Sequence, residues 1–347
     1  MRVLSLTLLL SMALLPAQTS STSLTFTGTR GPGLGRHVVL LSGDEEYRSE
    51  ESMPMLAKIL SERHGFTTTV LFALDDDGTI NPNNGASLSD PAALDRADLI
   101  VMALRFRHWS DETMARFQRK VLAGTPIVAI RTSTHAFNGF PAGSPWARWN
   151  YNNDGGFGRE VLGETWVNHW GRHKIEGTRG VVEPGARRHP VMNGITTLAG
   201  DTDVYEAYPA PDAEILVRGL VLQTLAPDAP AASYQKTRAS DKQPQDVNTP
   251  PMPIVWTRLH HNPGGAVNRT LTSTIGSATD LANEGVRRLI VNGVFWALGL
   301  QVPPKADVTI VDPYEPSSYG FDAFRKGLRP SDFAMGHAPS GPPRTAP

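Results

Sequence analysis

Short apolar runs alternate with helix-like segments along the first third of the chain, and this alternation limits the fold more than any other feature. Apolar runs typical of buried strands occupy residues 37–41, 67–74, 98–104 and 127–130. Segments with helical spacing separate them at residues 52–65, at 91–97 and from Ser110 onward. Such an alternation predicts an α/β fold with a doubly wound, mostly parallel sheet and right-handed crossovers.

The second half of the chain is less regular. It predicts, in chain order, a structured loop or lid at 138–158, a short helix at 159–170, strands at 174–182, 203–208 and 214–222, an exposed insertion at 226–253, a hairpin at 254–258 and 267–275, and a helix at 283–299. These segments suit loop insertions and a late extension of the same sheet. One main domain over residues 36–302 is therefore expected, followed by a Pro/Gly-rich tail at 303–347.

Composition excludes several classes of protein. The 347 residues carry a formal net charge of −1, with 40% hydrophobic and 19% charged residues, so no excess of positive charge would attract nucleic acid or an anionic membrane surface. There is no cysteine. Disulfides, thiol nucleophiles and thiolate metal ligands are therefore excluded.

The N-terminal residues have the pattern of an export signal. Arg2 precedes an apolar run at residues 3–15, and small residues follow. We expect a signal peptide within residues 1–23, cleaved between Ala17 and Ser23, and then a flexible lead-in at 24–35. The mature protein would be periplasmic or secreted and free of the membrane.

Polar side chains follow three of the predicted strands. They are Asp44, Glu45 and Glu46 after the first, Arg105 and Arg107 after the third, and Arg131, Thr134 and His135 after the fourth. In a parallel sheet these loops share one edge, where ligands bind. The mixture suits a polyhydroxylated or anionic small molecule. The alternative, a solvated network of salt bridges, has equal support from composition alone.

His169 and His173 form a second constellation. On a helix, two histidines four residues apart share a face and can bind a divalent metal ion, although Gly171 would weaken the helix. Nearby aromatic residues suit stacking against a sugar, or plain packing of a loop; they are Trp146, Trp149, Tyr151, Trp166 and Trp170. Tyr205, on the predicted strand at 203–208, is a further candidate to line the site.

Four separated motifs together resemble the trehalose-utilisation (ThuA-like) family. They are the strand followed by Gly43-Asp-Glu-Glu-Tyr47, the elbow from Ile130 to Phe137, the His189-Pro-Val-Met-Asn-Gly-Ile195 segment, and Gly276-Ser-Ala-Thr-Asp280 with the helix from Arg288 to Gly299. The resemblance covers roughly residues 36–302. It implies a flavodoxin-like three-layer sandwich similar to class I glutamine amidotransferases, and a role in disaccharide or keto-sugar catabolism.

The resemblance includes one departure. In the amidotransferase superfamily the elbow carries a cysteine, and here Arg131 takes that position. Thiol-based glutamine hydrolysis is therefore excluded, and Ser133 activated by His135 is a weaker substitute.

Keto-sugar chemistry needs a base beside a carbonyl and a cation for the developing oxyanion. We therefore expect Arg131 to clamp an anion or carbonyl and His135 to act as acid and base, with Glu45 or Glu46 as a second acid or base. The expected substrate contacts are Asp44, Arg105, Arg107, Thr134, Trp166 and Tyr205, and His169 and His173 would be lid contacts or metal ligands.

Three interpretations remain open at this point. The chain is an exported enzyme acting on a sugar or keto-sugar, a non-catalytic carbohydrate-binding or scaffold protein, or a metal-dependent hydrolase. The last requires His169 and His173 to converge with His135 or a carboxylate. The sequence leaves the oligomeric state and the identity of any cofactor open.

Overall fold

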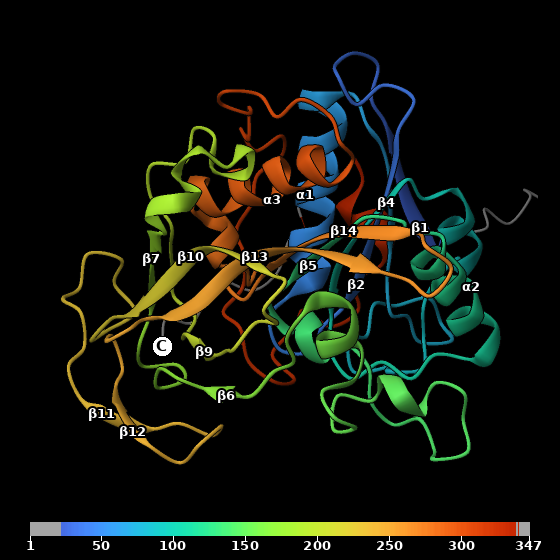
Figure 1. Cartoon of the computed structure of the whole chain (residues 1–347). Helices are drawn as coiled ribbons and strands as arrows, with labels where there is room; N and C mark the ends of the chain where they lie inside the picture. The colour runs from blue at the N-terminus through green and yellow to red at the C-terminus, as the bar shows by residue number, and fades with distance from the viewer. Residues whose placement is uncertain (1–21, 338, 340–347) are drawn as a thin grey trace, which may run out of the picture.

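A mixed sheet runs through the molecule, whose computed structural model describes residues 22–337 and 339 (Figure 1). Within these residues its ten strands follow the order β1 (Ser23–Thr27), β3 (Thr67–Leu71), β2 (His37–Gly43), β4 (Leu99–Leu104), β5 (Ile127–Ile130), β14 (Val267–Ser273), β13 (Met252–His261), β10 (Glu214–Val221), β7 (Thr178–Val182) and β8 (Ala199–Gly200). The five strands from β3 to β14 are parallel, and the strands on either side of them are antiparallel. The predicted α/β class with a doubly wound parallel centre is confirmed.

Helices cover both faces of the parallel strands and make a three-layer sandwich. α1 (Ser49–His64) and α3 (Glu284–Ala297) pack on one face, and α2 (Asp111–Leu122) packs on the other with the short helix η1 (Pro91–Arg96) (Figure 1). Successive residues of a strand point to opposite faces. In β2, Val38 and Leu40 accordingly join the core under α1 and α3, whereas Val39 and Leu41 join the core under α2.

Helix ends follow the sequence signals. Gly65 ends α1 with a left-handed φ of 82°, and its N–H bonds back to the carbonyls of Leu60 and Ser61. Ser110 begins α2 by accepting a hydrogen bond from the Thr113 N–H, and Asn283 begins α3 in the same manner. The caps fix where each helix starts or stops, and so where the loops between helices and strands begin.

Further short elements complete the chain. They are the single-turn helices η2 (Arg131–His135), η3 (Ala147–Trp149), η4 (Gly158–Leu162, a π-helical turn), η5 (Pro184–Arg188), η6 (Pro190–Met192), η7 (Asp280–Ala282) and η8 (Pro330–Phe333), and the strands β6 (Asn168–His169), β9 (Tyr205–Glu206), β11 (Gln235–Thr237) and β12 (Pro244–Asp246). β6 pairs with β9, and β11 pairs with β12.

Several local predictions were wrong. The lead-in at 24–35 begins as strand β1, which pairs with β3 because alternating Leu24 and Phe26 are buried at the sheet edge. Residues 159–170 are helical only as far as Leu162, and Gly163 then takes a left-handed φ of 95° that ends the turn. The predicted strand at 203–208 is reduced to the two residues of β9.

Most of the expected signal peptide, residues 1–21, lies outside the described residues. Among the residues that the structure does describe, no helix has both the length and the apolar character needed to cross a membrane.

Candidate functional site

A sharp turn follows the central strand β5. Arg131, the first residue after Ile130, has φ of 48°, a left-handed conformation that non-glycine residues rarely adopt. Such a conformation persists only where the surroundings hold it. The elbow expected from the sequence is therefore present, and its first residue is an arginine.

The Arg131 side chain turns into the protein and is only 1% exposed. Nη1 donates to the carbonyl oxygens of Asp203 (2.9 Å) and Thr274 (2.6 Å), and Nη2 donates to Oδ1 of Asp203 and Oη of Tyr47, each at 3.1 Å. The guanidinium carbon also lies 3.8 Å from the ring centroid of Tyr205. Both terminal nitrogens are thus committed to the protein, so Arg131 anchors Asp203.

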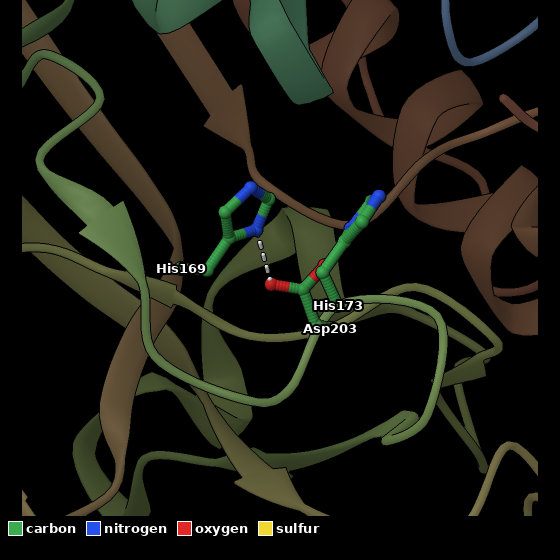
Figure 2. A group of neighbouring side chains, drawn as sticks. All are labelled: His169, His173 and Asp203. Atoms are coloured by element: carbon green, nitrogen blue, oxygen red, sulfur yellow. Dashed lines mark hydrogen bonds and ion pairs between the residues drawn. The ribbon is translucent and has the colours of Figure 1, made fainter. Parts of the chain in front are cut away.

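Asp203 in turn brings two histidines together. Its Oδ2 lies 2.8 Å from Nδ1 of His169, and its Oδ1 lies 3.0 Å from Nδ1 of His173 (Figure 2). The imidazole centroids are 4.6 Å apart. The Asp203 side chain is fully buried, whereas the side chains of His169 and His173 are 34% and 25% exposed. We call these three residues the His–Asp cluster.

The predicted convergence of His169 and His173 is present, but a helix does not produce it. His169 ends strand β6 and pairs with Tyr205 of β9. It therefore lies beside Asp203, which precedes Tyr205 by two residues. Gly171 lets the chain pass close to Asp203, because a Cβ there would lie 3.3 Å from the Asp203 Cβ. The turn after Gly171 then brings His173 to the same carboxylate.

Opposite charges in the cluster shift each other's pKa values and favour the charged forms of Asp203 and His173. Burial alone would raise the pKa of Asp203, but contacts with His169 and His173 and the charge of Arg131 hold that pKa well below its ordinary value. Burial lowers the pKa of His173, yet its contacts with Asp203 and Glu46 outweigh burial and raise the pKa to about 9. Asp203 is therefore an anion that organises cations around it.

Glu46 flanks the cluster, and Asp44 holds the loop that carries it. Oε1 of Glu46 lies 3.0 Å from Nε2 of His173, although this buried oxygen accepts no aligned hydrogen bond. Asp44 is fully buried; its Oδ1 accepts from the backbone N–H groups of Glu46 (2.8 Å) and Tyr47 (3.0 Å). The Thr132 hydroxyl donates to its other oxygen. Asp44 thus shapes the loop, and Glu46 faces the cluster.

Glu45 lies apart from the cluster, in an ion-pair network with two arginines. It pairs with Arg105, and its Oε2 lies 3.2 Å from Nη2 of Arg107. Arg107 is 2% exposed and also donates to the carbonyls of Arg105, Pro82 and Asn84. Burial and the charge of Asp44 raise the pKa of Glu45 against the opposing effect of the two arginines.

His135 is buried at the end of η2, beside the Thr134 hydroxyl, whose oxygen lies 3.3 Å from its Nδ1. Burial, together with the charges of Arg105 and Arg131, lowers its pKa well below the ordinary value and so favours the neutral ring. Ser133 is no substitute nucleophile, because its buried hydroxyl donates to the Met102 carbonyl at 2.8 Å.

Aromatic and imidazole rings form a continuous band across this side of the molecule. Successive centroids lie between 4.6 and 5.8 Å apart. In order, the members of this ring band are Tyr151, Phe106, His135, Trp166, His169, His173 and Tyr319. All but His135 are half-buried. Tyr205 lies beneath it, buried, with its ring 5.6 Å from that of His169.

The C-terminal tail supplies the last member of the ring band. Tyr319 stacks 5.2 Å from the ring of Tyr47, and its hydroxyl donates to the Asp201 carbonyl at 3.0 Å. The neighbouring Gly320 N–H donates to the Glu46 carbonyl at 2.8 Å. The tail is therefore fastened to the loop that carries Glu46.

Sequence reasoning missed Asp203, Tyr47 and Tyr319 as site residues. Asp203 stands two residues before Tyr205 on the same segment, and an acidic residue starting a half-buried strand was the available signal. Tyr47 follows Glu46 directly in the strand-end motif. Nothing in the tail singles out Tyr319, because only tertiary packing brings it to His173.

Two kinds of chemistry are open to the His–Asp cluster. A carboxylate that orients an imidazole supports acid–base catalysis, because it fixes the ring and stabilises its protonated form. Two imidazoles and one carboxylate around a common point can instead coordinate a metal ion. The convergence with a carboxylate that the metal-dependent interpretation required is present, through Asp203.

The chain is similar to proteins of one known family. The chain matches the ThuA family, described as trehalose utilisation, over residues 37–297. It is similar in structure to a ThuA-like protein from Parabacteroides merdae (15% identity, 79% of this chain and 96% of that one, TM-score 0.49). It is likewise similar to a ThuA-like protein from Bacteroides uniformis (14% identity, 78% of this chain and 95% of that one, TM-score 0.46). No curated protein matches the chain. With the family match extending over most of its length, the chain belongs to the ThuA family of trehalose-utilisation proteins.

Proposed function

We propose that this protein binds a sugar or keto-sugar of disaccharide catabolism on the ring band and transforms it at the His–Asp cluster. One observation carries the proposal: the half-buried rings of Trp166 and Tyr319 flank His169 and His173, whose nitrogens Asp203 holds in place. Membership of the trehalose-utilisation family supports the same class of substrate.

A sugar has apolar ring faces and a rim of hydroxyl groups. Aromatic side chains can pack against the apolar faces of the sugar, and a few well-placed polar groups can bind its hydroxyl groups and fix its orientation. Trp166 supplies a ring face in the band, and the two imidazoles supply polar atoms within the same surface, with the buried Glu46 carboxylate next to His173. The Glu45–Arg105 pair adds a charged boundary, where Arg105 lies 4.3 Å from the Phe106 ring centroid.

The proposed reactive residues differ from those that the sequence favoured. Arg131 and His135 are buried, and the terminal nitrogens of Arg131 are already bonded to protein acceptors. His169 and His173 are the more accessible groups, and Nε2 of His169 has no hydrogen-bond partner within the described part of the chain. We therefore assign proton transfer or carbonyl polarisation to the cluster, and a supporting role to Arg131.

The test begins with a thermal-shift screen of the purified protein against disaccharides and their keto forms. A ligand that binds the native state raises its apparent stability by mass action. Sugars that shift the transition are then incubated with the protein, and products are separated by chromatography. His169→Ala and His173→Ala should lose product formation, whereas His261→Ala, an exposed histidine at the far end of β13, should behave as wild type.

Each outcome bears on the proposal. Binding with turnover that depends on His169 and His173 supports it. Binding without turnover contradicts the enzymatic part and favours a carbohydrate-binding protein. No binding by any disaccharide or keto form contradicts the proposal as a whole.

We further propose that the protein works outside the cytoplasm, in the periplasm or as a secreted protein. The apolar run at residues 3–15 after Arg2 supports this proposal. Cell fractionation tests it, and full-length protein confined to the cytoplasm would contradict it.

A further inference from the structure

We infer that His169, His173 and Asp203 bind one divalent transition-metal ion. The inference deepens the proposed function and rests on it for the role of the ion, which would be an electrophile at the proposed sugar site. The binding itself depends only on the three side chains. They come from the β6 strand, the turn after it and the segment before β9.

The spacing of the donor atoms fits such an ion. One nitrogen of each histidine and one oxygen of Asp203 lie within 4.8 Å of one another. The Nδ1 atoms of His169 and His173 lie 2.8 and 3.0 Å from the carboxylate. Ligands at the usual bond lengths of about 2.0–2.2 Å from one ion have similar mutual distances. Small side-chain movements therefore suffice to place all three around one centre.

The surroundings have the support that metal ligands need. Metal-binding imidazoles commonly direct their second nitrogen at a carboxylate, and metal-binding carboxylates are themselves hydrogen-bonded. Here Nε2 of His173 lies 3.0 Å from Glu46, and Asp203 accepts from Arg131 at 3.1 Å. Glu46 is 4% exposed, and its Oε1 has no aligned hydrogen bond, so this buried oxygen points at the cluster with unused capacity.

The cluster also has an open side. His169 and His173 are partly exposed, so solvent or a substrate oxygen could complete the coordination of an ion held by the three protein ligands. Two imidazoles and one carboxylate favour Zn²⁺, Co²⁺ or a similar ion over Mg²⁺, which prefers oxygen ligands. The competing explanation is a metal-free ion-pair network in which Arg131 and His173 balance Asp203 and Glu46.

Titration calorimetry on the full, tag-free chain distinguishes these explanations. Protein freed of metal by a chelator and then dialysed is titrated with Zn²⁺, and a parallel sample receives Co²⁺, whose visible spectrum reports its ligands. Wild-type protein should bind one equivalent. His169→Ala and His173→Ala should each weaken binding by more than about 100-fold, and Glu46→Gln by about 10–100-fold. His261→Ala is the matched control and should bind as wild type.

Circular dichroism establishes that each variant is folded. Absence of Zn²⁺ and Co²⁺ binding by wild-type protein at micromolar concentrations would overturn the inference. So would binding that the His169 and His173 substitutions leave unchanged. Because no sugar is present, metal binding without any sugar binding in the separate screen would sustain this inference and contradict only the proposed function. Sugar turnover by metal-free protein would sustain the proposed function and contradict the role of the ion as an electrophile, whereas the titration alone decides whether the ion binds.

Discussion

Asp203 holds the candidate site together at the scale of single residues. Its carboxylate accepts a hydrogen bond from Arg131 and contacts His169 and His173, so one carboxylate joins the elbow to the partly exposed histidines. A buried carboxylate is costly unless cations and donors surround it. The Asp203 carboxylate therefore requires Arg131, His169 and His173 to lie close to it.

Replacing Arg131 by Ala should destabilise the protein strongly. The change leaves Asp203 buried without its guanidinium partner and leaves the Thr274 carbonyl without its donor. Loss of one member of a buried ion pair costs about 3–5 kcal/mol. Urea denaturation, followed by circular dichroism, measures the difference in the free energy of unfolding.

Arg36→Ala is the control for this prediction. Arg36 lies 3.8 Å from Asp98 on the surface, with its side chain 49% exposed, so its loss should cost no more than about 1 kcal/mol. Equal costs for Arg36→Ala and Arg131→Ala would contradict the anchoring role of Arg131.

At the scale of elements, the site lies where two local structures meet. One is the elbow, strand β5 followed by η2, and the other is the antiparallel pair of the two-residue strands β6 and β9. The π-helical turn η4 packs against the elbow through Gly158, where a Cβ would lie 2.0 Å from the Thr134 carbonyl oxygen. A residue without a side chain is therefore required at this contact.

Gly158→Ala should force η4 away from the elbow. The added methyl group meets backbone atoms that cannot rotate aside, and overpacking of this kind costs about 1–3 kcal/mol or more. Gly143→Ala is the matched control, since nothing lies within 4 Å of the position that its new methyl group would take, and its change should stay within about 0.5 kcal/mol. Thermal and urea unfolding of both variants measure the contrast, and equal stabilities would contradict the tight contact.

The parallel strands could be predicted because each is a local pattern. Val38 to Leu41 and Ile127 to Ile130 are continuously apolar, as strands buried on both faces must be. The His–Asp cluster could be predicted only in part. Two histidines near one another in sequence were visible, but Asp203 lies 34 residues after His169 in the chain and reaches it only through the pairing of β6 with β9. Pairing of two-residue strands leaves no periodic signal.

At the scale of the whole molecule, the C-terminal tail closes the structure around α1. Ser317 donates from its backbone N–H to Glu51 at 2.7 Å, and Lys58 pairs with Asp312. A hollow between α1 and the tail is lined by Met55, Lys58, Val311, Tyr314 and Phe333, among others. The tail thus both contributes Tyr319 to the ring band and covers a helix of the core.

Global stability should depend on pH through Glu50 of α1. Its carboxylate is 2% exposed, and neither oxygen has a hydrogen-bond partner from another described residue. Burial, only partly offset by the charge of Arg48, raises its pKa from 4.5 to about 8. Between these values the folded state binds more protons than the unfolded state, so this group makes stability fall as the pH rises.

Glu50→Gln removes that dependence. The stability of the variant relative to wild type should increase from pH 5 to pH 8, with a slope of at most about 1.4 kcal/mol per pH unit. Urea denaturation of both proteins at several pH values gives this difference directly. A difference that does not change with pH would show that Glu50 titrates normally in the folded protein.

A crystal structure of the protein with a sugar or keto-sugar that binds in the thermal-shift screen would test the proposed site directly. We expect sugar density against Trp166, with a sugar oxygen in contact with His169 or His173. Density in the hollow between α1 and the tail, or anywhere away from the ring band, would contradict it.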